Sequence, residues 1–460
     1  MSTTQHRPVV TELRLSAFKT HRGATFGLGP LTLLTGSSGT GKSSVLEGLT
    51  ALGRLACGAG LHEVFETSVR GGAAACVPQG AQPDVQGRRG FRIGCTVTGP
   101  IGPVRLDIAV QAEPTLRIVG ERLTGAGETL LTTALRDPAR STVQAAWHTA
   151  GAVAVTRAPL PDDLLATAML PLRVAGRTDG QRLVLAAAEQ VVVALRGVFP
   201  VAPRPELMRA PVALGDGRLR TACDNLSAVL ARTEGECVTR HAALVNAVRA
   251  VCSPPVEGLT TLPAPLPGGN RGPAAGGTPT AGGTLTAEAA TAVGATIAAV
   301  DRGPLGLVPI DRLGDGELRF LALALVLLTG PGVLDVDTST ELLPAGQVLT
   351  VLADGLDLGL DRRQAGELLR LAGLAAARGH IRLLGTVQDA SFLDGLGGVS
   401  VTTLGAGPAQ DREPAPCAGP CADPDTARGT DRRTAGPDAA EAESAAGADG
   451  DLGDGVDQSG

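Results

Sequence analysis

The sequence predicts an α/β fold that combines an antiparallel β lobe with a helical insertion. Three observations carry this prediction. A β-rich N-terminal segment leads into the run G-x-x-x-x-G-K-S and then into a helical pattern; residues 91–123 are rich in alternating and β-branched side chains; and residues 181–198 and 224–252 have apolar side chains at helical spacing. With 460 residues, the chain suffices for one large domain or for two to three smaller ones.

The elements follow in order along the chain. Residues 9–35 predict two strands on either side of a Gly29-Pro30 turn, and a helix is expected over about 42–56. The segments 91–99, 104–112 and 115–123 predict an antiparallel meander. A strand-like segment at 294–300 precedes an apolar helix that begins near residue 314. The C-terminal part predicts a strand ending at Asp354, a helix over 362–377 and a strand over 381–387.

We therefore expect four regions. Residues 1–125 form an N-terminal lobe with the glycine-rich loop and the β meander, and residues 126–255 form a helical region. Residues 256–404 form a C-terminal lobe that contains a low-complexity loop at 263–283. Residues 405–460 have few large apolar side chains, so we expect a disordered acidic tail that cannot bury a core.

Composition narrows the function classes. The net charge of −6 is carried by the tail, which has 12 acidic and 4 basic residues, whereas the rest of the chain is nearly neutral with 36 basic and 34 acidic residues. Neither this balance nor the content of seven Phe, one Trp and no Tyr argues for nucleic acid. The eight cysteines lack zinc-site spacing. The N-terminus has no signal-like apolar core, and the apolar run 320–328 is too short to span a membrane, so we expect a cytoplasmic protein.

The run "LTLLTGSSGTGKSS" carries the firmest functional prediction. A strand precedes it and a helix follows it, as in a phosphate-binding P-loop. Glycines let backbone N–H groups close on phosphates, the lysine reaches the β- and γ-phosphates, and the serine hydroxyl binds Mg²⁺. Only two lysines occur in the chain, and one is in this run. The predicted ATP- or GTP-binding residues are Gly36, Ser37, Ser38, Gly39, Thr40, Gly41, Lys42, Ser43 and Ser44.

A second segment, "LGDGE" at 313–317, opens the strongly apolar helix. It resembles the signature motif of ABC-class ATPases, in the form seen in RecF- and SMC-type proteins. The N-terminal segment through the P-loop, including Phe18-Lys19, is similar to that group as well. A glycine-rich turn that merely caps a core helix is the alternative. The bias towards Ala, Gly and Arg favours a GC-rich bacterial gene of actinomycete type.

The resemblance implies an ABC-type, P-loop NTPase head that binds ATP and Mg²⁺ and dimerises head to tail around two ATPs. In the family, the signature segment binds the γ-phosphate of the ATP held by the other subunit, which assigns Gly314, Gly316 and Glu317 to the nucleotide. Gly314 stands where the family has serine. No long heptad arms follow, so the chain is not expected to carry an SMC coiled coil.

"VLTVLADGLDLGLD" resembles the Walker B strand and D-loop of that family, with Asp354 as the Mg²⁺ ligand beside Ser43. Asp337, in "GVLDVD", is the alternative aspartate: it lies closer to the signature segment, whereas Asp354 follows it by 41 residues. We prefer Asp354 because an apolar strand precedes it and a helix and a strand follow in the expected order.

Two further positions depart from the family. Gly355 replaces the catalytic glutamate, and Gln388 stands where the family has its switch histidine. Glycine cannot orient or deprotonate water, whereas glutamine can hydrogen-bond a γ-phosphate or position water. Asp357 is the nearest replacement carboxylate, or else a solvated loop residue. Gln388 and Asp357 are thus the candidate catalytic residues.

Two functions from different classes follow. The first is a RecF/SMC-like ATPase with weak hydrolysis, whose ATP-driven dimerisation gates DNA binding in repair, recombination or defence; the resemblance alone implies DNA. The second is a hydrolysis-deficient, nucleotide-gated switch or scaffold that acts on a protein partner, which Gly314, Gly355 and Gln388 favour.

Overall fold

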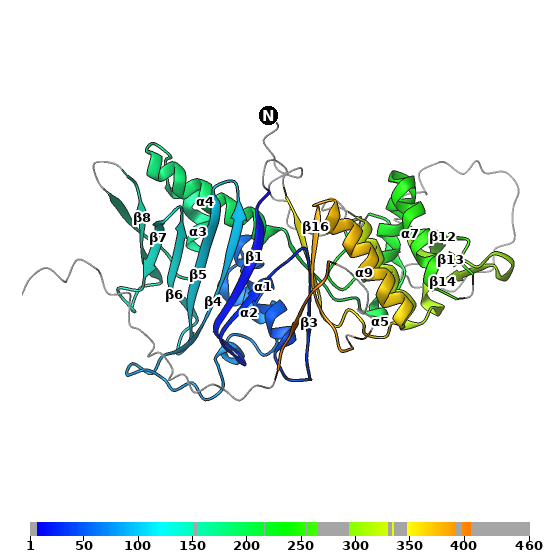
Figure 1. Ribbon diagram of the computed structural model, residues 1–460, viewed down its shortest axis with the longest axis horizontal. Coiled ribbons are helices and arrows are strands. Elements are labelled where there is room, and N and C mark those ends of the chain that lie inside the picture. Colours follow the sequence, from blue (N-terminus) through cyan, green and yellow to red (C-terminus); the bar gives the residue numbers. More distant parts are fainter. Residues whose placement is uncertain are drawn as a thin grey trace, which may run out of the picture. The chain divides into compact units, whose positions relative to one another are not determined.

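The computed structural model describes residues 7–150, 154–215, 217–253, 255–264, 294–329, 334, 347–389, 391 and 398–405. An antiparallel sheet, a parallel sheet and a smaller antiparallel sheet organise these residues, with helices packed between and against them (Figure 1). The α/β fold class with an antiparallel β lobe is therefore confirmed. Asp337, nearly all of the low-complexity loop 263–283, and the tail beyond Gly405 lie outside the described residues.

The large antiparallel sheet contains the predicted meander. Its strand order is β2 (His21–Gly27), β1 (Val9–Phe18), β4 (Arg89–Gly99), β5 (Gly102–Glu113), β6 (Arg117–Gly125), β7 (Glu128–Ala134), β8 (Thr142–His148) and β9 (Val155–Pro161). Buried and more exposed side chains alternate along β5 and β8, as expected for a sheet with one covered face. The covered face packs against the helices α1 (Lys42–Ala56) and α4 (Asp179–Arg196).

The prediction that residues 126–255 are helical is wrong for about the first third of this region. Residues 128–161 form β7, β8 and β9 and extend the sheet, and the helices α3 (Ala166–Arg173) and α4 begin only afterwards. The strands are rich in Thr, and "TVQAAWH" alternates with a period of two, which is a strand signal that the alanine content of the region obscured.

The parallel sheet combines a strand from the N-terminal part of the chain with strands from its middle and C-terminal parts. Its order is β10 (Val198–Val201), β15 (Leu349–Ala353), β16 (Ile381–Thr386), β3 (Leu31–Thr35) and β17 (Ser400–Thr403), all paired in parallel. Fully buried apolar runs such as "LTVLA" in β15 suit a sheet that is covered on both faces. Helices α1 and α9 (Arg362–Ala377) pack against it. The carboxyl ends of β3, β15 and β16 therefore lie at one edge of the sheet.

The remaining elements surround the smaller sheet. Strand β13 (Ala295–Asp301) pairs with β12 (Gly258–Ala264) on one side and with β11 (Val212–Ala213) and β14 (Leu307–Pro309) on the other. Its helical neighbours include α6 (Leu226–Glu236). The apolar helix predicted near 314 is α8 (Asp315–Leu328), which packs against α7 (Val238–Val251), α9 and the short α5 (Pro205–Met208). Helix α2 (Leu61–Ser68) packs on α1.

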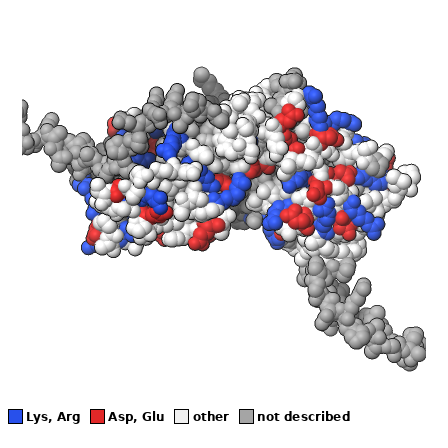
Figure 2. Space-filling view, turned by 90° about the horizontal axis from the view of Figure 1, so that it is seen from below, with Lys and Arg blue, Asp and Glu red and all other residues white. Residues whose placement is uncertain are grey.

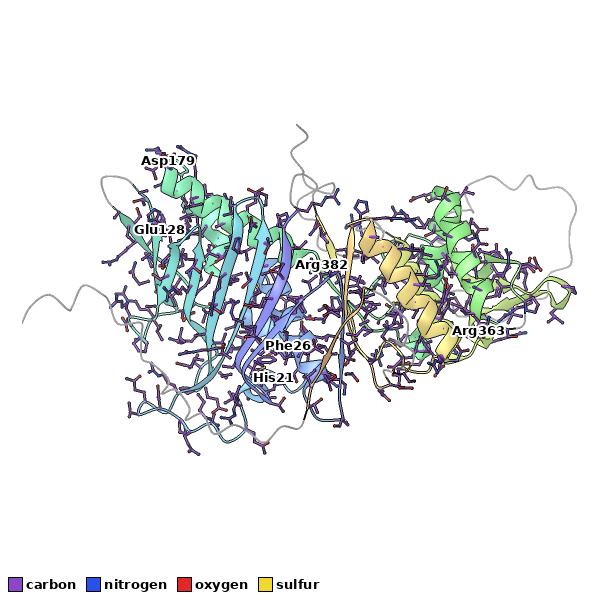
Figure 3. The ribbon with its side chains drawn as sticks, in the orientation of Figure 1. His21, Phe26, Glu128, Asp179, Arg363 and Arg382 are labelled. Atoms are coloured by element: carbon purple, nitrogen blue, oxygen red, sulfur yellow. The ribbon has the colours of Figure 1, made fainter. Side chains whose placement is uncertain are left out.

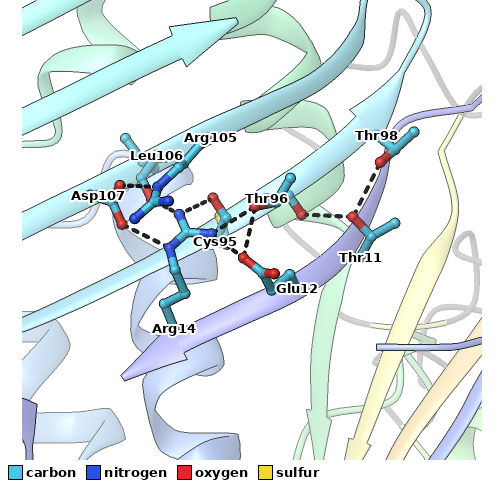
Figure 4. A network of polar contacts seen from close by, with 9 residues as sticks. All are labelled: Thr11, Glu12, Arg14, Cys95, Thr96, Thr98, Arg105, Leu106 and Asp107. Atoms are coloured by element: carbon cyan, nitrogen blue, oxygen red, sulfur yellow. Dashed lines mark hydrogen bonds and ion pairs between the residues drawn. The ribbon is translucent and has the colours of Figure 1, made fainter. Parts of the chain in front are cut away.

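A buried arginine holds three strands of the large sheet together. The Arg14 guanidinium on β1 pairs with Glu12 at 2.5 Å and with Asp107 at 3.0 Å, and it donates to Thr96 and to two backbone carbonyls (Figure 4). Arg105 also pairs with Asp107, so two cations and two carboxylates balance one another. A buried charge is tolerated because its partners and hydrogen bonds are supplied in this way.

Glu121 on β6 is a structural residue, as its place in the meander suggests. Its carboxylate is 3% exposed and accepts hydrogen bonds from the backbone N–H groups of Ala166 and Thr167, each at 2.7 Å, and from the Thr167 hydroxyl. It therefore caps the N-terminus of α3 from a neighbouring strand. Burial raises the pKa of the Glu121 carboxyl, while the hydrogen bonds from Thr167 and Ala166 lower it.

Replacing Glu121 tests this capping contact. We expect Glu121→Ala to lower the free energy of unfolding by about 2–3 kcal/mol, because buried N–H groups lose a charged acceptor. Glu128→Ala, at an exposed position on β7 (Figure 3), is the matched control and is expected to change it by less than about 0.5 kcal/mol. Urea unfolding followed by circular dichroism measures both. Equal midpoints for Glu121→Ala and wild type would contradict the capping role.

Candidate functional site

The P-loop lies between the carboxyl end of β3 and the start of α1. Strand β3 ends at Thr35 and the helix begins at Lys42, so the first N–H groups of α1 and its positive end face the loop. The Lys42 ammonium donates to the carbonyl oxygens of Gly36 and Ser37. Thr40 donates its hydroxyl to the Ser37 carbonyl at 2.9 Å, which tightens the loop.

The β1–β2 hairpin packs directly on the P-loop. A Cβ on Gly41, which has φ +91°, would lie 2.5 Å from the Thr20 hydroxyl and 2.6 Å from Nε2 of His21. His21 Nε2 hydrogen-bonds the Gly41 carbonyl at 3.0 Å, and its ring meets Phe26 edge to face (Figure 3). Burial lowers the pKa of His21, against the raising effect of this hydrogen bond. Gly41 is thus required for close approach of the hairpin as well as for the loop conformation.

Asp354, at the end of β15, meets the P-loop helix across the edge of the parallel sheet. Its Oδ1 accepts hydrogen bonds from the Ser43 hydroxyl at 3.0 Å and from the Thr386 hydroxyl at 2.7 Å. Thr386 belongs to β16, the strand between β15 and β3, and its hydroxyl in turn accepts from the Gly355 N–H at 2.7 Å. Ser43 and Asp354 offer adjacent oxygen donors of the hard type that Mg²⁺ prefers, while Asp354 remains 44% exposed.

A basic cluster borders the same carboxylate. The Arg70 guanidinium, 71% exposed, lies 3.7 Å from Oδ2 of Asp354 and 2.7 Å from the Glu47 carboxylate. Lys19 pairs with the other oxygen of Glu47 at 2.5 Å and donates to the Arg70 carbonyl at 3.1 Å. Because Glu47 lies on α1, this cluster fixes an exposed cation beside the P-loop helix and the candidate metal ligand. An anionic ligand at this edge would meet Arg70 as well as Lys42.

Gly355 is conformationally constrained as well as chemically inert. It has φ +64°, its N–H is bonded to Thr386, and its carbonyl accepts from the Leu358 N–H at 2.9 Å. The turn after β15 therefore needs a left-handed residue directly after Asp354. A glutamate at this position would have to adopt that backbone conformation or change the turn.

Asp357 and Gln388 are brought together. Oδ2 of Asp357 accepts hydrogen bonds from the backbone N–H groups of Gln388 at 2.8 Å and Asp389 at 3.0 Å. Oδ1 of Asp357 is buried and, among the described residues, has no hydrogen-bond partner. The Asp357 carboxylate is therefore engaged with protein, contrary to the alternative of a solvated loop residue, whereas Gln388 is exposed.

The signature-like segment lies at the N-terminus of α8. Gly314 is the N-cap residue, and the carbonyl of Leu313 and the Asp315 carboxylate accept hydrogen bonds from Arg209 at 2.8 and 2.6 Å. Glu317 pairs with the buried Arg302 at 2.6 Å. Gly316 packs on the turn after β15, where a Cβ would lie 2.2 Å from the Gly359 carbonyl oxygen.

The candidate residues thus fall into two groups. The P-loop, Asp354 and, through Asp357, Gln388 converge at one edge of the parallel sheet. In the described part of the chain, no hydrogen bond or ion pair joins residues 313–317 to residues 36–44, so Gly314, Gly316 and Glu317 belong to the second group.

Sequence reasoning missed Thr386, Arg70 and His21. A threonine that ends a strand is too common to stand out, and Arg70 lies in a segment without periodicity. Lys19, one of two lysines in the chain, was the only sequence feature that pointed to this part of the site. Its ammonium pairs with Glu47 and donates to the Arg70 carbonyl. Among the described residues, no group of three or more His, Cys, Asp or Glu is placed to hold a metal ion.

No family model and no curated protein sequence matches the chain. The solved structures that resemble it include an SMC head bound to the C-terminal winged-helix domain of ScpA (TM-score 0.42, 11% identity, 84% of this chain and 91% of that one). They also include the SMC head domain from Thermotoga maritima (0.36, 11%, 85% and 94%) and RecF with ATP (0.37, 11%, 84% and 95%).

The resemblance to RecF- and SMC-type proteins predicted from the sequence recurs among these structures. No residue role is transferred from these structures; each role is inferred from the contacts within this chain. The bacterial, actinomycete-like origin stays a prediction. In the part of the chain that the structure covers, no helix has the length and apolar character needed to cross a membrane.

Substituting Gly355 tests the requirement for a left-handed residue. We expect Gly355→Ala to lower the free energy of unfolding by about 1–2 kcal/mol, the cost of a side chain in that conformation. Gly366→Ala is the matched control: its site in α9 is open, so alanine is expected to stabilise by about 0.5–1 kcal/mol. Chemical denaturation measures both variants. A stabilised Gly355→Ala would show that the turn does not need glycine.

Proposed function

We propose that the chain binds ATP with Mg²⁺ at the carboxyl edge of the parallel sheet and that the bound nucleotide controls association of two copies. The observation that carries this proposal is the hydrogen-bonded set of Ser43, Asp354 and Thr386 next to the P-loop. If the glycine-rich run were only a chance turn, nothing would explain why Asp354, 311 residues after Ser43, lies at a strand end and hydrogen-bonds the Ser43 hydroxyl.

The residues present fit the two groups. Backbone N–H groups of residues 36–44 and the Lys42 ammonium would hold the phosphates, and the Ser43 hydroxyl and the Asp354 carboxylate would hold Mg²⁺. Bound Mg²⁺ supplies charge neutralisation for the phosphate oxygens. Arg70 adds a cation at the same edge, since its guanidinium is exposed and already fixed by Glu47.

Hydrolysis is expected to be weak. Gly355 offers no carboxylate, and one oxygen of Asp357 is committed to Gln388 and Asp389 while the other is buried. A general base needs a free lone pair within hydrogen-bond reach of the attacking water. Gln388 can hydrogen-bond the γ-phosphate or position water, but it cannot accept the proton.

The second candidate function is a nucleotide-gated switch or scaffold for a protein partner. The substitutions at Gly314, Gly355 and Gln388 favour it, because binding contacts are retained where the groups for chemistry are replaced. The DNA-linked alternative rests on the resemblance. Basic and acidic side chains are interspersed on the face seen in Figure 2, in keeping with the nearly neutral body of the chain. In both cases we expect the homodimer to form through the N-terminus of α8.

ATP binding is tested with the purified full chain by isothermal titration with Mg²⁺-ATP. We expect Lys42→Ala to weaken binding by at least about tenfold, because a charged hydrogen-bond donor to phosphate is lost. Arg92→Ala removes an exposed cation on β4, outside the P-loop, and is expected to bind like wild type. Equal affinities for Lys42→Ala and wild type would disprove the P-loop assignment.

Phosphate release with and without DNA separates the two functions. We expect turnover about 10²–10⁴-fold below that of an ATPase with an intact general base, and no stimulation by DNA. The Lys42→Ala variant defines the background. DNA-stimulated turnover that disappears in Lys42→Ala would instead support the DNA-linked ATPase and would place the water-activating group elsewhere in the site.

A further inference from the structure

We propose that Asp357 is a positioning residue that sets the place of Gln388 and links it to the N-terminus of α8. The proposal rests on the ATP-binding function above and adds a role that the sequence did not predict. Asp357 is assigned here neither as a base nor as a metal ligand. Its carboxylate holds the segment after β16 against the turn after β15.

The contacts of Asp357 support holding rather than proton transfer. Its Oδ2 accepts from two successive backbone N–H groups, those of Gln388 and Asp389, just past the end of β16. Such N–H groups have no strand partner, and a carboxylate that accepts both fixes the direction in which the chain leaves the sheet. The other oxygen is buried without a hydrogen-bond partner in the described part of the chain, so bulk water does not reach it.

The same two segments are joined on either side of this contact. Before it, the Leu356 N–H donates to the Thr386 carbonyl at 2.8 Å. After it, the Arg362 guanidinium donates to the Ser391 carbonyl at 2.6 Å. The chain from Gly355 to Arg362 is therefore tied to the chain from Thr386 to Ser391 on both sides of Asp357, and Asp357 makes the contact next to Gln388. A displacement of one segment has to be followed by the other.

The far side of the turn carries α8. Gly316 in the first turn of α8 packs against the Gly359 carbonyl, with room for hydrogen but not for a Cβ. Next along the chain, Asp361 and Gln364 form a capping box that starts α9. The turn 354–361 thus begins with the candidate metal ligand Asp354, contacts Gln388 in its middle and contacts the signature-like helix near its other end. A contact between Gln388 and a γ-phosphate would therefore be transmitted through Asp357 and the turn to the position of α8.

The test compares Asp357→Ala with the conservative Asp357→Asn and with Gln388→Ala. Asparagine keeps an acceptor for the two N–H groups, whereas alanine removes it. The readout is the ratio of the ATP and ADP affinities, because only ATP offers the γ-phosphate. We expect Asp357→Ala and Gln388→Ala each to lower this preference by about tenfold, and the double variant to lower it no further. Asp357→Asn is expected to stay within about twofold of wild type.

Amide hydrogen exchange supplies a readout that does not depend on nucleotide. We expect the amides of Gln388 and Asp389 to exchange at least about tenfold faster in Asp357→Ala than in wild type, and at wild-type rates in Asp357→Asn. Asp179→Ala, at the exposed start of α4 (Figure 3), controls for loss of a surface carboxylate and is expected to leave both readouts unchanged.

Several results would overturn the assignment. Unchanged exchange at Gln388 and Asp389 in Asp357→Ala would do so, as would an unchanged affinity ratio. A loss in Asp357→Asn as large as that in Asp357→Ala would show that the charge matters rather than the position. If the wild type binds no ATP, the proposed function fails, and the exchange rates alone then decide whether Asp357 holds the Gln388 segment.

Discussion

The hydrogen bonds from Ser43 and Thr386 to one oxygen of Asp354 are the constraint on which the rest of the fold depends. They can form only where β3, β16 and β15 are neighbours in parallel, so that the ends of three strands distant in the sequence meet at one edge. A parallel sheet of this kind must be covered on both faces, which accounts for the continuous apolar runs in its strands and for the helices that pack on it. The energetic contribution of each bond is modest, since Asp354 is partly exposed, but the placement that they demand is strict.

What the sequence predicted well is local. The P-loop, its strand and its helix are encoded within about 25 consecutive residues, so pattern and turn chemistry suffice. The same holds for the apolar strand before Asp354, for α9 and for the strands of the meander up to Gly125. The strands over 128–161 were missed because alanine and threonine are compatible with either a helix or a strand, and only pairing with β6 decides between them.

The sequence could not show which residues from distant segments meet at the site. Arg70, Thr386 and His21 are ordinary residues in ordinary segments, and they become part of the site because Glu47, β16 and the β1–β2 hairpin bring them there. The engagement of Asp357 is of the same kind: spacing alone left it either a relocated catalyst or a solvated aspartate, whereas its two N–H partners lie more than 30 residues further along the chain. Tertiary contacts of this type have no local signal.

The glycine at 355 and the shape of the turn after β15 belong together. A glycine at 355 permits the left-handed turn in which the Gly355 N–H meets Thr386 and the Leu356 N–H meets the Thr386 carbonyl. That turn in turn presents Asp357 to Gln388 and the Gly359 carbonyl to α8. A glutamate at 355 would therefore compete with the contacts that tie the candidate metal ligand Asp354 to Gln388 and to the signature-like helix.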